Sequence, residues 1–250
     1  MKAVQPEFRR FAAQMVAQPP LFCDIDLLFR YLCTFLGKKK EQMGNQYREP
    51  DYWSRKAFAE GYPARSVYKL EEMQKRFNLF GKNDNVLDLG AAPGSWTTFL
   101  LRFLSPEGRV CAVDLQPLSE SIRDPRLSFF QGDLTAAAMA AAVKNCGPYR
   151  SVICDAAPAT TGNKIVDTAR SAALVDMALY YAETQLEAHG SFVVKIFQGG
   201  SEQQYLQQMR KLFKTARAFK PEACRNSSFE TYLLGLDFIL SEKAVATSTK

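Results

Sequence analysis

The chain lacks the features that mark secreted, metal-binding and membrane-spanning proteins. Its six cysteines include no C-x-x-C pair, and Cys111 and Cys154 lie inside apolar runs, so we expect reduced core cysteines and no metal site. The first seven residues have no apolar core, and the apolar run over 21–36 is interrupted by charged residues. We therefore expect neither secretion nor a membrane span, and we expect a cytoplasmic protein.

The composition is that of a globular protein with a surplus of positive charge. Hydrophobic residues make up 47% and charged residues 23% of the 250 residues, which is enough for one large core. The formal net charge is +6, and no basic low-complexity tail accounts for it. Since the surplus must lie on the folded surface, the charge favours an acidic partner such as RNA.

From residue 85 onward, short apolar runs alternate with helical patterns. We predict strands over 86–89, 110–114, 127–131, 151–155, 191–197, 214–220 and 231–239. We predict helices over 95–104, 134–146, 166–187 and 202–213, preceded by two more over 51–60 and 64–78. This alternation predicts an α/β, Rossmann-like sheet that is mostly parallel, with helices on both faces. The last two strands have no long helix between them, so we expect a C-terminal antiparallel hairpin at the sheet edge.

The motif D-N-V-L-D-L-G-A-A-P-G-S-W at 84–96 predicts the site of a nucleotide-like cofactor. Gly90 and Gly94 let the backbone turn sharply and approach a ligand, and the helix that follows offers unpaired N–H groups. Asp114 ends the next strand, where a carboxylate can bind both hydroxyls of a ribose. The loop is not G-x-G-x-x-G, and together with Trp96 it resembles the S-adenosylmethionine loop of methyltransferases. The alternative is a turn that serves topology alone.

Three further charged residues fall at or near the same edge of the predicted sheet. Asp133 follows the third strand and Asp155 ends the fourth, so both lie beside the crevice of the glycine loop. For Asp133, an N-cap of the next helix is the alternative. Asp155 ends an apolar run and would be costly to bury without a cation, which Lys195 can provide. Lys195 interrupts the apolar strand S-F-V-V-K-I-F, and its alternative is a solvated edge-strand lysine.

Four separated motifs give the chain a family resemblance. Lys69 in R-S-V-Y-K-L-E-E, Asp155 in D-A-A-P, Lys195 in F-V-V-K-I-F-Q-G and Glu230 in S-S-F-E-T-Y resemble the Lys-Asp-Lys-Glu tetrad of the FtsJ family of RNA ribose 2′-O-methyltransferases. The similarity runs from about residue 52 to 238. Departures are modest: D-A-A-P-A-T-T-G replaces the more usual D-M-A-P-N-x-S-G, which affects the detail of the pocket and not the reaction.

The resemblance implies the cofactor, the reaction and the roles of the site residues. It implies that S-adenosyl-L-methionine is the cofactor and that Lys195 accepts the proton of a ribose 2′-hydroxyl. Burial and Lys69 would lower the pKa of Lys195, whereas Asp155 and Glu230 would raise it, and the sequence leaves open which effect dominates. The implied catalytic residues are Lys69, Asp155, Lys195 and Glu230, and the implied cofactor contacts are Gly94, Trp96, Asp114, Asp133 and Asp155.

The implied substrate is a uridine of 23S ribosomal RNA in the large ribosomal subunit, methylated by a monomeric enzyme. Two alternatives remain open: the same chemistry on transfer RNA, a cap or another ribosomal RNA site, and a non-catalytic RNA-binding factor of ribosome assembly. The basic residues near the tetrad in the sequence are candidate phosphate contacts, with a solvated surface charge as the alternative for each. These candidates are Arg55, Lys56, Arg65, Lys220 and Arg225.

The first 42 residues stand apart from the motifs. They contain an amphipathic helix candidate over 7–17, a second apolar helix candidate and the run K-K-K at 38–40. We predict a helical extension over 1–42 and a methyltransferase domain over 43–250. The extension could bind RNA, pack on the domain, or precede a true start at Met43.

Overall fold

The computed structural model describes residues 51–225 and 228–239. The predicted extension over 1–42 lies outside these residues, and the predicted boundary at residue 43 stays a prediction. The described helices are α3 (Tyr52–Ala59), α4 (Val67–Phe77), α5 (Ser95–Phe103), α6 (Ala137–Cys146), α7 (Lys164–Gln185) and α8 (Glu202–Leu212). The described strands are β1 (Asn85–Leu89), β2 (Arg109–Asp114), β3 (Leu127–Gln131), β4 (Tyr149–Cys154), β5 (Leu186–Phe197), β6 (Phe213–Phe219) and β7 (Glu230–Phe238).

The described strands form one seven-stranded sheet in the order β3-β2-β1-β4-β5-β7-β6. β1 to β5 run parallel to their neighbours, and β7 is antiparallel to both β5 and β6. The mostly parallel sheet and its C-terminal hairpin are confirmed. β7 inserts between β5 and β6, so Glu230 pairs with Phe197 and Tyr232 pairs with Lys195. This insertion places the residues of β7 beside the end of β5.

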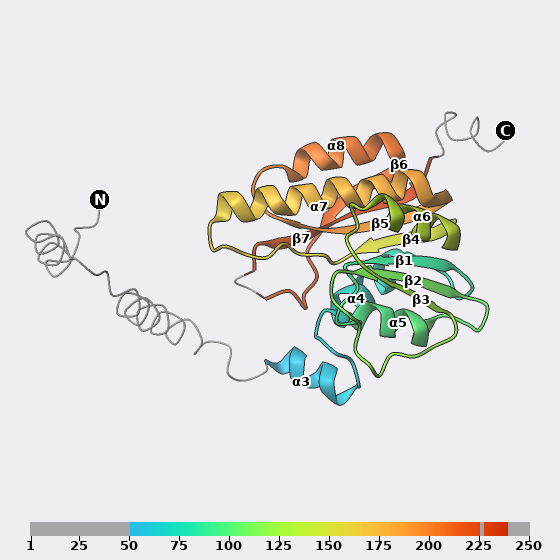
Figure 1. The fold of residues 1–250 in the computed structure, drawn as a ribbon. Helices are drawn as coiled ribbons and strands as arrows, with labels where there is room; N and C mark the ends of the chain where they lie inside the picture. Colours follow the sequence, from blue (N-terminus) through green and yellow to red (C-terminus); the bar gives the residue numbers. More distant parts are fainter. Residues whose placement is uncertain (1–50, 226–227, 240–250) are drawn as a thin grey trace, which may run out of the picture. The chain divides into compact units, whose positions relative to one another are not determined.

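Helices cover both faces of the sheet, as predicted (Figure 1). On one face, α6, α7 and α8 contribute Val143, Val175 and Met209 to a core with the central strands. On the other face, α4 and α5 contribute Met73 and Leu100 to a second core. β1 is buried on both sides, which explains its largely apolar sequence, N-V-L-D-L, with Asp88 as the exception. Within the described part of the chain, no helix is both long and apolar enough to span a membrane.

The starts of α6 and β5 differ from the prediction for identifiable reasons. α6 begins at Ala137 and not at Leu134, because Asp133 forms a turn in which its carboxylate accepts from the amide N and the hydroxyl of Thr135, both at 2.8 Å. β5 begins at Leu186, five positions before the predicted start. In this extra segment the pairing with β4 is irregular, so its apolar residues do not alternate as in a regular strand.

Candidate active site

A cavity of about 520 Å³ opens at the carboxyl ends of the parallel strands. Its wall is formed by the segments that follow β1, β2, β3 and β4, by the end of β5 and by one face of α7. This is the edge at which open α/β sheets bind their ligands. Asp114, Asp133, Asp155 and Lys195 all line the cavity, so the fold brings these four predicted residues to one place.

The glycine loop after β1 is shaped by the protein's own packing. Gly90 has φ +73°, and a Cβ atom there would lie 2.6 Å from the Cα atom of Ala156. Gly94 has φ +109°, and its Cβ would lie 2.1 Å from the side chain of Ile122. A side chain at Gly90 would clash with the Ala156 backbone, and at both positions φ lies in the left-handed region that favours glycine. Gly90 lines the cavity and Gly94 precedes the first turn of α5.

Asp114 connects the end of β2 to the glycine loop. One carboxylate oxygen accepts a 2.9 Å hydrogen bond from the amide N of Ala92, and the other accepts a 2.8 Å bond from the amide N of Gln116. Each oxygen keeps a second lone pair for a ligand hydroxyl. Asp133 is exposed on the rim, and its bonds with Thr135 hold its pKa below the ordinary value. The two carboxylates lie at the ends of the neighbouring strands β2 and β3.

Lys195 and Asp155 form an ion pair at the base of the cavity. The Lys195 Nζ atom lies 2.9 Å from Oδ1 of Asp155 and also donates to the Asp155 carbonyl. Lys195 is only 7% exposed, so it is not the solvated edge-strand lysine of the alternative reading. The hydroxyl of Tyr232 donates a 2.7 Å hydrogen bond to the same Oδ1. One carboxylate oxygen therefore accepts from two side chains of neighbouring strands.

The structure indicates the charge state of Lys195, which the sequence left open. Burial would lower the pKa of Lys195, but the Asp155 carboxylate beside it outweighs burial and raises that pKa above the ordinary lysine value. Burial would raise the pKa of Asp155, but Lys195 and then Lys69 hold it below the ordinary value. Both directions agree that the pair is an ammonium and a carboxylate at neutral pH in the free protein.

Lys69 and Glu230 form a second ion pair beside the first. Lys69 lies in the first turn of α4, and its ammonium donates to the Glu230 carboxylate at the start of β7. The Lys69 Nζ atom also lies 5.8 Å from the ring centroid of Tyr232. Tyr232 thus contacts both pairs, through its ring on one side and its hydroxyl on the other. The four predicted tetrad residues are brought together as two adjacent ion pairs.

Trp96 lies behind the cavity wall. Its side chain is buried, its indole N–H donates a 2.8 Å hydrogen bond to the carbonyl of Ser66, and its ring centroid lies 6.0 Å from that of Tyr232. Ser66 precedes α4 and lines the cavity. Neither Gly94 nor Trp96 is among the described residues that line the cavity. Their assignment as cofactor contacts stays a prediction.

Sequence reasoning missed Tyr232, Ser66 and Asp88 as members of the site. A signal for Tyr232 existed, because it lies two residues after Glu230 and therefore on the same face of one strand. Asp88, in the glycine-loop motif, is fully buried and accepts a 2.7 Å hydrogen bond from the Thr97 hydroxyl. Its Oδ1 atom has no hydrogen-bond partner among the described residues. Burial raises the pKa of Asp88 to about 7.

Several of the candidate RNA contacts have partners within the protein. Arg65 donates to the carboxylate of Asp51 and to the carbonyl of Ala223. Arg225 lies 3.6 Å from the same Asp51 carboxylate. The Lys220 ammonium donates a 2.7 Å bond to the Ser228 carbonyl, and the Lys56 Nζ atom lies 4.6 Å from the ring centroid of Tyr68. Their role toward RNA stays a prediction.

Three features place this protein in the class of Rossmann-like methyltransferases: the sheet order, the carboxylate that ends β2 and the buried lysine at the end of β5. Comparisons with known proteins narrow this class. A family model described as FtsJ-like methyltransferase matches residues 62–238. The chain therefore belongs to the FtsJ-like methyltransferase family, and the resemblance predicted from the four motifs is confirmed.

Curated relatives match most of the described part of the chain. The chain is 72% identical over 194 residues to ribosomal RNA large subunit methyltransferase E of Treponema denticola, with 78% of this chain and 98% of that protein covered. It is 46% identical over 190 residues to the protein of the same name in Oleidesulfovibrio alaskensis, with 75% and 91% covered. The corresponding protein of Treponema pallidum strain Nichols is 44% identical over 194 residues, with 78% and 96% covered.

Solved structures support the fold. A Plasmodium falciparum protein described as a ribosomal RNA methyltransferase has a TM-score of 0.61 and 23% identity, with 71% of this chain and 98% of that chain covered. A Lactococcus lactis protein described as a hemolysin has a TM-score of 0.51 and 17% identity, with 76% and 99% covered. At these identities the likeness concerns the fold alone.

Proposed function

We propose that this protein transfers a methyl group from S-adenosyl-L-methionine to a ribose 2′-oxygen of RNA, at a uridine of 23S ribosomal RNA in the large ribosomal subunit. The observation that carries the proposal is the buried Lys195–Asp155 pair, with 2.9 Å between Nζ and Oδ1, at the base of the cavity lined by Asp114 and Asp133. The names of the curated relatives, ribosomal RNA large subunit methyltransferase E, support the substrate.

The residues of the cavity fit S-adenosylmethionine. Asp114 has lone pairs for the ribose hydroxyls, and the apolar side chains of Leu115, Leu134 and Met177 line the same cavity and suit a flat base. Asp133 and Asp155 are the acceptors for the donor groups of the base and of the methionine part. The cofactor supplies a methyl group that its sulfonium already makes electrophilic, so the protein has to align a nucleophile and remove a proton.

Lys195 is the proton acceptor in this proposal. Its amine must be neutral to take the proton of the 2′-hydroxyl, whereas Asp155 keeps it charged in the free protein. The reaction therefore depends on the fraction of protein in which this lysine has lost its proton. Asp155 and Tyr232 hold the amine in position, and Lys69, oriented by Glu230, binds the ribose or the neighbouring phosphate as a compact cation.

The surplus of positive charge supports an RNA substrate in either of two forms, free ribosomal RNA or an assembling large subunit. We propose a monomeric, cytoplasmic enzyme. A second candidate keeps the chemistry and changes the RNA to transfer RNA, a cap or another ribosomal RNA site. A non-catalytic assembly factor is disfavoured because both ion pairs of the tetrad are formed.

Methyl transfer to defined RNAs tests the proposal. The purified full-length protein would be incubated with labelled S-adenosylmethionine and with large subunits, free 23S RNA or transfer RNA from cells that lack the gene. We expect label in large-subunit RNA, at the 2′-oxygen of a uridine, and none with Lys195→Ala. Methylation of a base, or of transfer RNA alone, would contradict the proposed substrate. RNA binding without any transfer would indicate the assembly factor.

A further inference from the structure

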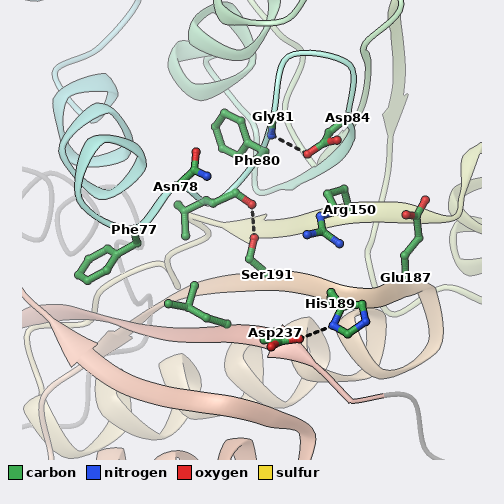
Figure 2. Close-up of a pocket in the computed structure, with 12 residues that line it drawn as sticks. Phe77, Asn78, Phe80, Gly81, Asp84, Arg150, Glu187, His189, Ser191 and Asp237 are labelled. Atoms are coloured by element: carbon green, nitrogen blue, oxygen red, sulfur yellow. Dashed lines mark hydrogen bonds and ion pairs between the residues drawn. The ribbon is translucent and has the colours of Figure 1, made fainter.

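A second cavity, of about 550 Å³, lies at the opposite edge of the sheet from the cofactor cavity. It is enclosed by the turn between α4 and β1, by the beginnings of β4 and β5 and by the end of β7 (Figure 2). Its volume is in the range of small-molecule sites. Residues of the tetrad do not line it, so the proposed methyl transfer leaves this cavity unexplained.

A bulge in β5 builds one wall of this cavity. Between two paired positions, β5 advances from Leu186 to Ser191 while β4 advances only from Tyr149 to Ser151. The bulged segment carries Glu187 and His189, which both line the cavity. His189 has φ +62°, a conformation that residues with a side chain rarely adopt. Such bulges and strained residues concentrate at functional sites.

The same strain occurs on the neighbouring strand. Asp237 also has φ +62°, and its carboxylate lies 2.5 Å from Nδ1 of His189 and 2.7 Å from Nζ of Lys214. Figure 2 shows His189 and Asp237 turned toward each other across the ends of β5 and β7. The His189–Asp237 pair stabilises an unfavourable backbone conformation at each of the two residues. This wall of the cavity is therefore formed by specific contacts and not by loose packing.

Several polar side chains of the cavity keep unused hydrogen-bonding groups. The side chains of Glu187 and Asn78 make no hydrogen bond or ion pair with any described residue, and Asp84 uses one carboxylate oxygen for a 2.6 Å bond from the amide N of Gly81. Arg150 uses Nη1 for a 3.0 Å bond to the Ala188 carbonyl, which leaves its other guanidinium donors. Glu187 and Arg150 come from neighbouring strands and line the same space (Figure 2).

This combination matches a guanine base. Guanine presents two adjacent donors, N1–H and the 2-amino group, to a carboxylate such as Glu187. It presents the acceptors O6 and N7 on another edge, where a guanidinium binds them. Phe77 lines the same cavity and is partly exposed, so its ring can contact a base. Adenine, uracil and cytosine do not offer two adjacent donors to one carboxylate.

The rim carries cations suited to phosphate. The ring of Phe77 packs against Phe219 with 5.1 Å between centroids. The Cζ atom of Arg217 lies 5.6 Å from the ring centroid of Phe77, and that of Arg76 lies 4.9 Å from Phe219. Both arginines are exposed, and neither forms an ion pair with a carboxylate of the described residues. A guanidinium that contacts an aromatic ring keeps N–H donors for a phosphate, as in contacts with RNA.

We propose that this cavity holds an unpaired guanine of the substrate RNA, with Arg76 and Arg217 binding the adjoining phosphates. The inference rests on the proposed function, because RNA is the partner that supplies a base and phosphates together. His189 and Lys195 are six residues apart on β5, so the second contact lies roughly 20 Å from the methyl-transfer site. An RNA that binds at both the guanine cavity and the methyl-transfer site has its methylated ribose positioned by a distant guanine.

Nucleotide binding tests the cavity without methyl transfer. The full-length protein, saturated with S-adenosylhomocysteine to occupy the cofactor cavity, would be titrated with guanosine, adenosine and uridine monophosphates by ligand-observed nuclear magnetic resonance. We expect the guanosine nucleotide to bind in the millimolar range and about fivefold or more tighter than the others. Glu187→Gln should weaken it by a similar factor, and Glu183→Gln on α7 should not. Equal binding of the three nucleotides, or no effect of Glu187→Gln, would overturn the proposal.

Steady-state kinetics test whether Arg76 and Arg217 bind the phosphates of the substrate RNA. The double variant Arg76→Gln with Arg217→Gln should raise KM for large-subunit RNA about fivefold or more with kcat unchanged. Arg210→Gln with Lys211→Gln on α8 removes the same charge elsewhere and is the matched control. If guanosine monophosphate binds but KM is unchanged, the cavity serves a free nucleotide and the proposal is wrong. If the wild-type protein methylates no RNA, the proposed function fails, and the titration still tests the cavity.

Discussion

The hydroxyl of Tyr232 and the ammonium of Lys195 share one oxygen, Oδ1 of Asp155, at 2.7 Å and 2.9 Å. The pKa of Tyr232 is raised well above its ordinary value by burial and by Asp155, so its hydroxyl stays a donor. This donor takes up part of the negative charge that keeps Lys195 protonated.

Replacing Tyr232 with phenylalanine should therefore move the pH dependence of methyl transfer to higher pH. Without the hydroxyl, Asp155 holds the Lys195 ammonium more strongly, and the neutral amine becomes rarer. One hydrogen bond of about 1 kcal/mol corresponds to a rate about fivefold lower at every pH below the pKa of Lys195. Single-turnover rates between pH 7 and pH 10 measure this. Tyr180→Phe on the exposed face of α7 is the control, and an unchanged profile in Tyr232→Phe would contradict the argument.

Lys195→Arg tests whether Lys195 is the general base. A guanidinium keeps the positive charge of the lysine, but it cannot become neutral and accept a proton at working pH. Both Lys195→Arg and Lys195→Ala should lower single-turnover transfer by about 10²-fold or more while cofactor binding survives. Since Asp155 raises the pKa of Lys195, the wild-type rate should increase with pH through the neutral and mildly alkaline range without a plateau. Lys144→Arg should behave as wild type. A fast arginine variant would reduce Lys195 to a positioning role.

Asp114→Ala should weaken S-adenosylmethionine binding. The variant loses a charged acceptor for the ribose and also the bond that fixes the amide N of Ala92. We expect a loss of about 1.5–3 kcal/mol in binding free energy by calorimetry, with RNA affinity nearly unchanged. Glu120→Gln removes an exposed charge nearby and should bind the cofactor normally. Unaltered affinity in Asp114→Ala would refute the assignment of the ribose ligand.

The buried carboxyl group of Asp88 should make the free energy of unfolding depend on pH. Burial raises its pKa to about 7, well above the ordinary value of about 4 for an aspartate, so between these two values the folded protein keeps a proton that the unfolded chain releases. The contribution of Asp88 to the free energy of unfolding therefore falls as pH rises from about 4 to about 7. Asp88→Asn abolishes this titration. Relative to wild type, it should gain about 3 kcal/mol between pH 5 and pH 8 in denaturant unfolding. A parallel pH dependence of the two proteins would exclude the raised pKa.

Deletion of residues 1–42 should leave cofactor binding and methyl transfer largely intact. All four tetrad motifs lie after residue 52, and the match to the Treponema denticola relative covers 98% of that protein with 78% of this chain. Calorimetry with the cofactor and transfer to large-subunit RNA measure the two activities separately. A soluble truncation that binds cofactor but has lost RNA methylation would show that the extension recruits the substrate.

The local features of the fold were predictable because they depend on neighbours in the sequence. Buried parallel strands are largely apolar, so the positions of β1, β2 and β4 followed from the pattern, and with them the carboxylates at the ends of β2 and β4. The start of β5 was wrong, because the bulge at 187–190 breaks the apolar pattern although the backbone still pairs. The charge of Lys195 was also undetermined, since burial and Asp155 act in opposite directions.

The class of fold and the sheet edge that carries the carboxylates could be predicted from the sequence, and the four tetrad residues stay predictions that the structure brings together. The contacts among these residues emerge only from the folded chain: the pairing of each lysine with its carboxylate, the bond from Tyr232 to Asp155, and the bond from the Trp96 indole to Ser66. The physical reason is separation along the chain. These contacts join residues that lie far apart in sequence, and their geometry depends on the insertion of β7 beside β5, which no local pattern encodes.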